Sequence, residues 1–130
     1  LNTETVRLWQ QKAENDYKTG IDELATEEPV TDTICFHMQQ CAEKYLKSYL
    51  VFHNREIPRT HNLAVILQSC IELDAAFQTL REQDIDLLTD YAVSLRYPDD
   101  FYMPSIEECV SARDLALKAR RFVQEKMKLD

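Results

Sequence analysis

Glycine is almost absent from this chain, and proline is rare. The 130 residues include one Gly and four Pro. Strand-rich domains need many tight turns, which favour Gly and the pairs Asn-Gly and Asp-Gly, and neither pair occurs here. This scarcity of chain-breaking residues argues against a turn-rich β fold and predicts an all-α protein.

Long apolar runs and paired cysteine motifs are also missing. No run approaches the roughly 20 residues of a membrane span, and the N-terminus has no signal-peptide pattern. No Cys-x-x-Cys spacing occurs, and each cysteine falls within or beside an apolar helical pattern. We therefore expect reduced, buried thiols in an intracellular, cytoplasmic protein, rather than disulfides or zinc ligands. The cysteines are Cys35, Cys41, Cys70 and Cys109.

Familiar reaction motifs are absent too. The chain has no Gly-rich phosphate loop, no His-Glu-x-x-His, no nucleophile elbow and no cluster with zinc or di-iron spacing. The pattern therefore predicts no catalytic residue, no metal site and no cofactor.

What is present is an ordinary globular balance, with 45% hydrophobic and 29% charged residues. This length fits one domain spanning residues 1–130. The net charge of −8 argues against a general nucleic-acid binder. The segment from Lys44 to His61, however, contains four Lys or Arg residues and one Glu. Its net charge is therefore +3, and that of the rest of the chain is −11. A local basic site on an acidic body is compatible with this distribution.

Apolar residues at three- and four-residue spacing predict the helices. Together they indicate an antiparallel up-and-down bundle of four long helices plus one or two short ones. Gly20, inside the first helix, is expected to cause fraying or a bend. The capping box Ser105-Ile-Glu-Glu108 marks the start of the last helix. We expect helices over Thr3–Leu24, from an N-cap at Thr31 or Asp32 to about His53, after an N-cap at Thr60, beyond Asp74, over Asp84–Arg96 and after Ser105.

The helix ending near His53 has one apolar and one polar face. Phe36 and Val51 interrupt the polar face, so we expect light packing against something such as a partner subunit. Lys44 and Lys47, with Gln40 beside them, are candidates to hold a phosphate or an acidic partner. The alternative is a solvated face with a Glu43–Lys47 ion pair, stabilising by a few tenths of a kcal/mol, and the pattern alone favours it.

Two further places are candidate sites. Arg59 and His61 lie at a helix start, where backbone N–H groups favour anions, although a structural, hydrogen-bonded His61 fits equally well. Arg96 and Tyr97 open the loop before the last helix, and loops on a rigid bundle often hold function. The cations near the C-terminus are read as a solvated helix end matched to the helix dipole.

The stretch from Ile34 to Leu67 contains a motif formed by Phe36, His37, Gln39, Gln40, Glu43, Lys44, Lys47, Thr60, His61 and Leu63. This motif resembles the signature of HEPN domain proteins, the higher eukaryotes and prokaryotes nucleotide-binding domain. Upstream Trp9, Ala13 and Asp16, and downstream Arg96-Tyr97-Pro98, are similar to the family pattern as well.

This resemblance implies a homodimeric bundle of the small prokaryotic type, with an ATP-like nucleotide ligand or a minimal nucleotidyltransferase partner in a toxin–antitoxin-like system. Many relatives are metal-independent ribonucleases with an Arg-x4–6-His motif. Here YPDDFYMPSI follows Arg96, and no His occurs beyond His61. The expectation is therefore a non-catalytic binding protein. The alternatives are a divergent ribonuclease using Arg96 with His61 or Tyr102, and a purely structural dimerisation module.

Overall fold

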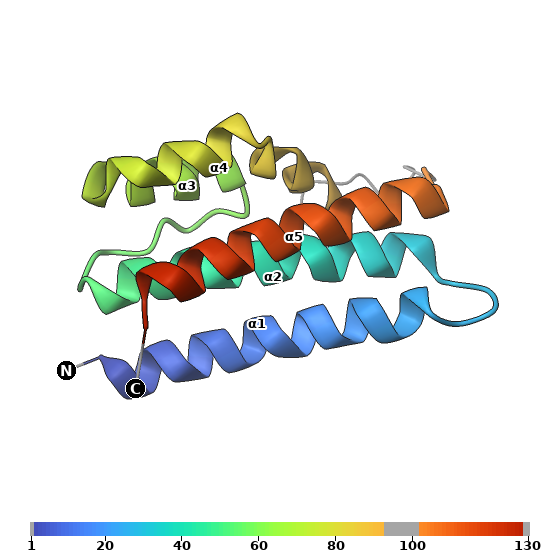
Figure 1. Cartoon of the computed structure of the whole chain (residues 1–130), viewed down its shortest axis with the longest axis horizontal. Coiled ribbons are helices and arrows are strands. Elements are labelled where there is room, and N and C mark those ends of the chain that lie inside the picture. Colours follow the sequence, from blue (N-terminus) through green and yellow to red (C-terminus); the bar gives the residue numbers. More distant parts are fainter. Residues whose placement is uncertain (1, 93–101, 129–130) are drawn as a thin grey trace.

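Three long helices lie side by side and form the body of the molecule (Figure 1). The computed structural model describes residues 2–92 and 102–128. Shorter helices cover one side of the body, and no strand occurs in these two ranges, so the predicted all-α bundle is confirmed. The elements are α1 (Thr3–Leu24), α2 (Thr31–Phe52), α3 (Leu63–Leu73), η1 (Ala75–Phe77), α4 (Gln78–Glu82), η2 (Ile85–Tyr91) and α5 (Ile106–Lys126), where η marks a 3-10 helix.

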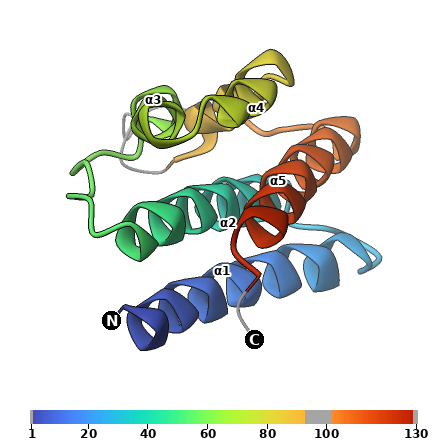
Figure 2. The same ribbon diagram turned by 60° about the vertical axis from the view of Figure 1, so that its left-hand side comes forward.

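The central element is α2. Figure 2 shows it between α1 on one side and the α3–α4 layer on the other, with α5 alongside. Its buried residues therefore occupy more than one face, and they include polar side chains as well as the apolar stripe. The apolar and polar faces predicted from the sequence therefore belong to a helix that is surrounded by its own chain.

The long helices do not all alternate in direction. Neighbouring α1 and α2 are antiparallel (Figure 1). In contrast, α5 runs in the same direction as α2. The Sγ atoms of Cys35 and Cys109 lie 3.8 Å apart near the starts of these helices, and Ser48 contacts Met127 near their ends. The short helices carry the chain back between them.

Helix limits follow the sequence signals closely where those signals are strong. The bounds of α1 match the prediction, and the capping box of α5 is confirmed by reciprocal bonds between Ser105 and Glu108. Two predicted caps are wrong. The N-cap of α2 is Val30, without a side-chain bond, and α3 is capped by Asn62, whose side chain accepts from the Ala64 N–H.

The predicted helix over Asp84–Arg96 is a 3-10 helix over Ile85–Tyr91, and its expected remainder lies largely outside the described residues. Ile85 and Leu88 are buried and Tyr91 packs against the core. These three are spaced by three residues. A 3-10 helix has three residues per turn and aligns them, whereas an α-helix would rotate them progressively away.

Gly20 is accommodated without a break, because α1 continues to Leu24. The residue is buried where α1 meets α2, and a Cβ placed on it would lie 2.5 Å from Cε of Met38. The predicted fraying is therefore wrong, and the missing side chain serves close helix packing.

All four cysteines are free and buried, as predicted. Burial raises the pKa of Cys35 and Cys41, and it raises that of Cys70 to about 12. Within the two described ranges, no helix combines the length and the apolar character that crossing a membrane requires.

Candidate functional site

The polar face of α2 is buried inside the single chain. Gln39, Glu43 and Lys47 retain 0%, 4% and 8% exposure. They follow one another at a spacing of four residues, which places them along one line of the helix. The chain itself covers this face, so its burial does not require a partner subunit.

Glu43 is the centre of this face. Its carboxylate accepts bonds from Lys47 Nζ at 2.8 Å and from Gln39 Nε2 at 2.9 Å, and His61 Nδ1 lies 2.9 Å away. Burial raises the pKa of Glu43, but the hydrogen bonds from these three residues outweigh burial and lower it. Because a carboxylate only accepts, His61 Nδ1 carries the hydrogen of this contact.

Gln39 extends the Glu43 contacts to the neighbouring segment. Its Nε2 also donates to the backbone carbonyl of His61 at 3.2 Å. Its Oε1 accepts from Gln40 Nε2 at 2.7 Å. The amide of Gln39 therefore both donates and accepts hydrogen bonds. It fixes the segment before α3 against the middle of α2.

A second charged cluster joins α2 to α1. Asp16 is 7% exposed, and its two carboxylate oxygens lie 2.7 Å from His37 Nδ1 and 2.6 Å from Lys44 Nζ. One carboxylate thus holds two residues of α2 that are seven positions apart. Lys44, a predicted phosphate contact, is engaged in this ion pair.

A third cluster joins α1 to α5. Arg120 donates to Glu14 from Nε at 2.6 Å and from Nη2 at 3.0 Å, and Tyr45 also donates to this carboxylate. Burial raises the pKa of Glu14, yet the bonds from Arg120 and Tyr45 lower it overall. The interpretation of the C-terminal cations as a solvated helix end is therefore wrong for Arg120. It describes Lys118 and Arg121, which are exposed.

The structure brings four of the seven predicted site residues into these clusters: Gln40, Lys44, Lys47 and His61. Arg59 is exposed in the segment before α3, and no ion pair involves it among the described residues. Arg96 and Tyr97 lie outside the described residues. The side chain of His61 is 44% exposed, so its Nε2 edge remains accessible while Nδ1 is held by Glu43.

Sequence reasoning missed the acidic anchors on α1. Asp16 had been noted only as part of the family pattern, and Glu14 not at all. Their partners lie far along the chain, so local spacing provides no signal for the pairing. A weak signal exists for Asp16, because it directly precedes Tyr17 of the apolar stripe.

The clusters are suited to fixing geometry rather than to coordinating a metal. No group of three or more His, Cys, Asp or Glu residues that could hold a metal ion occurs in the described part of the chain. The acid at the centre of each cluster is already bonded to cationic or hydrogen-bond donors. The exposed groups near Glu43 include the ring of His61 and the guanidinium of Arg59.

The helices of this bundle are joined by partly or fully buried ion pairs and hydrogen bonds. The protein is therefore a helical bundle in which the polar residues of α2 take part in the packing. The HEPN domain family model matches residues 6–128. This match covers nearly the whole chain, and the protein belongs to the HEPN domain family. Comparison with curated proteins and with solved structures finds no match.

Proposed function

We propose that this protein is a non-catalytic HEPN module that binds a nucleotide and/or a minimal nucleotidyltransferase partner. In this proposal it acts as a homodimer in a prokaryotic, toxin–antitoxin-like system in the cytoplasm. The observation that supports a binding role is the saturation of Glu43 by Lys47, Gln39 and His61. A residue whose charge is committed to the fold positions its neighbours and is not free to move a proton.

The proposed contact surface is the outer edge of the Glu43 cluster. Arg59 supplies an exposed guanidinium, which suits a phosphate or a partner carboxylate. His61 presents its outer ring edge, and Gln40 and Lys44 are partly exposed beside it on α2. Lys47 acts through Glu43 as a positioning residue, because it is too buried for direct contact.

Calorimetry tests this proposal with ATP and, separately, with the product of the neighbouring gene. We expect binding of at least one of them, weakened at least tenfold by Arg59→Ala, since a charge-assisted contact contributes about 1.5–3 kcal/mol. Lys18→Ala removes another exposed cation and should leave binding unchanged. Silence from both ligands would refute the proposal.

One observation favours the ribonuclease alternative. Glu43 orients His61 through Nδ1 and leaves the opposite edge accessible, the arrangement a general acid or base requires. Incubation of the wild-type protein with RNA in the presence of a chelator tests it. Cleavage that disappears in His61→Asn would establish this second function, whereas intact RNA leaves the binding role alone.

A further inference from the structure

Two of the four buried thiols meet where α2 and α5 begin. Cys35 is the fifth residue of α2 and Cys109 is the fourth residue of α5. Their Sγ atoms lie 3.8 Å apart, although the two residues are 74 positions apart in the chain. In the described part of the chain, no such contact between thiols is found for Cys41 or Cys70. The fold therefore places one particular pair of cysteines side by side.

A disulfide between Cys35 and Cys109 requires only a small movement. An S–S bond is about 2.05 Å long, so the two sulfurs must approach each other by roughly 1.8 Å. Side-chain rotation and a slight shift of the helix start supply a movement of this size, because the ends of helices open more readily than their centres. The pair is therefore close to a cross-linked geometry in the reduced fold.

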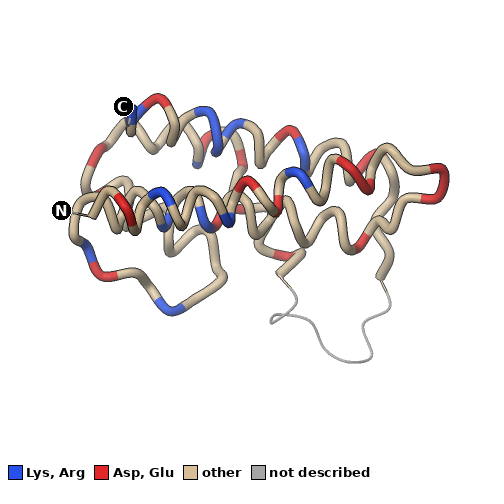
Figure 3. Tube along the Cα trace, turned by 90° about the horizontal axis from the view of Figure 1, so that it is seen from below, with Lys and Arg blue, Asp and Glu red and all other residues tan. Residues whose placement is uncertain are grey.

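The surroundings of the two thiols are acidic, which restricts the kind of oxidant that fits. Burial raises the pKa of both thiols, and the carboxylate of Glu108 adds to this effect, joined at Cys109 by Asp32. The α1–α2 turn, which lies at the same end of the bundle, carries further acids (Figure 3). An anionic oxidant such as glutathione disulfide is repelled by these charges, whereas a small neutral oxidant is not.

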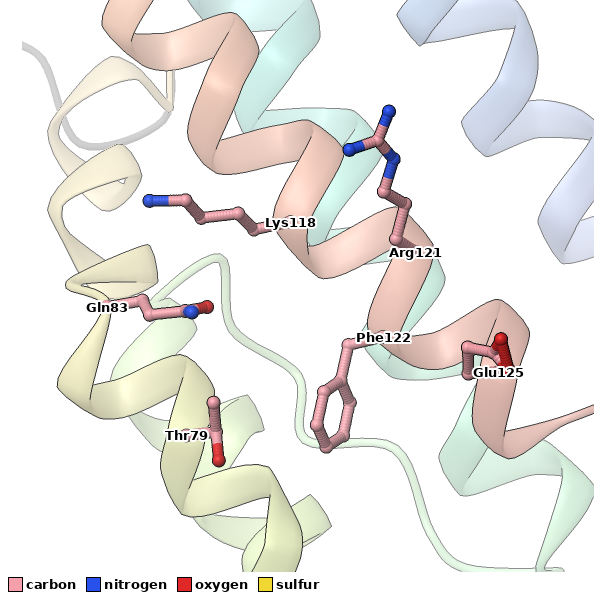
Figure 4. A pocket seen from close by; sticks show the side chains of 6 residues that line it. All are labelled: Thr79, Gln83, Lys118, Arg121, Phe122 and Glu125. Atoms are coloured by element: carbon pink, nitrogen blue, oxygen red, sulfur yellow. The ribbon is translucent and has the colours of Figure 1, made fainter.

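The start of α5 can open without release of the rest of the helix. Later turns are anchored by Arg120, which donates to Glu14, and by Phe122, whose ring centroid lies 4.8 Å from that of Phe77. Figure 4 shows the Phe122 side chain extending from α5 toward the side of α4. A brief opening of the first turns therefore exposes Cys109 while these anchors keep the helix docked.

We propose that Cys35 and Cys109 form an oxidation site for hydrogen peroxide, which converts the two thiols into an intramolecular disulfide between α2 and α5. Peroxide first oxidises the Cys109 thiol to a sulfenic acid and is itself reduced to water. The Cys35 sulfur then attacks the sulfenic sulfur, the S–O bond breaks, and the oxygen leaves with the Cys35 proton as a second water. Two thiols and one hydrogen peroxide thus give one disulfide and two waters.

The contact between the sulfurs favours the second of these steps. Once the start of α5 closes again, the sulfenic acid lies beside Cys35, so the attack is intramolecular and proceeds at a high effective concentration. The closed helix also shields the sulfenic acid from further peroxide. The resulting bond links residues 74 positions apart, restricts the unfolded chain and holds the start of α5 on α2. The site shares no residue with the Arg59–His61 edge and is independent of the proposed function.

The test is treatment of the native full chain with excess hydrogen peroxide, followed by intact-mass measurement and peptide mapping. We expect a loss of two hydrogen atoms and a cross-linked peptide pair containing Cys35 and Cys109, both reversed by dithiothreitol. Oxidation of Met103, which is 65% exposed, adds oxygen and is therefore distinguished by mass. The matched control Cys41→Ser/Cys70→Ser removes the other two buried thiols and should retain the cross-link.

Single variants examine the two steps separately. Cys35→Ser should lose the cross-link and leave a sulfenic acid on Cys109, which dimedone captures, whereas Cys109→Ser should lose both products. Oxidation should shift the urea midpoint of the wild-type protein upward and leave that of Cys109→Ser unchanged.

Three results would overturn the proposal: no cross-link in the native wild-type protein, a cross-link that forms only after unfolding, or a linkage that involves Cys41 or Cys70. Faster cross-linking by glutathione disulfide than by peroxide would overturn the assignment of the oxidant.

Discussion

His61 Nδ1 lies 2.9 Å from Oε1 of Glu43, and this contact ties the segment before α3 to the middle of α2. The two residues are 18 positions apart in the chain. The contact closes the loop between α2 and α3 over a face that would otherwise expose a row of charged groups. The polar motif of the family is thus, in this chain, a part of the core.

Removing the central acid should destabilise the fold strongly. The side chains of Glu43 and Lys47 are 5% and 10% exposed, so Glu43→Ala leaves a buried ammonium without its partner. We expect a loss of roughly 3 kcal/mol in the free energy of unfolding. Urea unfolding measures it. Lys18→Ala breaks the exposed Lys18–Asp22 pair and should change stability by less than about 0.5 kcal/mol. Similar losses in both variants would contradict a buried role for Glu43.

The carboxylate of Glu43 should also make the free energy of unfolding depend on pH. The pKa of Glu43 in the folded protein lies below its usual 4.5, so the unfolded chain takes up the proton first as pH falls. The stabilisation is full above that usual value and is lost as pH drops through the folded pKa. Unfolding free energies measured from neutral to acid pH should therefore fall less steeply in Glu43→Gln than in the wild type. Identical slopes would exclude this linkage.

Gly20 and Met38 should behave as a coupled pair. Gly20→Ala gains about 1 kcal/mol of helix propensity, but its Cβ must displace the end of Met38. We expect the single change to alter stability by less than about 1 kcal/mol. In a Met38→Ala background the displacement disappears, so the same change should stabilise by about 1 kcal/mol. A double-mutant cycle by urea unfolding measures the difference, and simple additivity would argue against the contact.

In the native protein the cysteines should react very slowly with a thiol reagent. Burial raises the pKa of all four thiols, which removes the reactive thiolate as well as access to it. We expect the rate of labelling by an aromatic disulfide to rise roughly a hundredfold or more on unfolding in guanidinium. Fast labelling of any native thiol would reveal local opening of the helix that holds it.

The sequence was sufficient for the elements with strong local signals. Periodicity located α1, and the Ser105–Glu108 capping box located α5, because both depend on residues within a turn of one another. The α-helix predicted over Asp84–Arg96 is instead a 3-10 helix over Ile85–Tyr91, because Ile85, Leu88 and Tyr91 are spaced by three residues.

The candidate site could be predicted only in part from the sequence. The Glu43–Lys47 pair was anticipated from its spacing, but its burial was not, because a helical pattern distinguishes faces without showing what covers them. The bonds from Asp16 to Lys44 and from Glu14 to Arg120 join residues 28 and 106 positions apart. Pairings of that range depend on tertiary packing, which local spacing does not encode.

The Glu14–Arg120 bond also bears on how the chain folds during synthesis. Glu14 is synthesised 106 residues before Arg120, and Gln10 is likewise synthesised 117 residues before Met127, which it contacts. While the ribosome still holds the last helix, Glu14 lacks its guanidinium, and the α2 surface that α5 covers is open to water. Such a nascent chain exposes apolar surface until α5 has left the ribosome and docked. Docking of α5 is therefore the step that covers this apolar surface of α2.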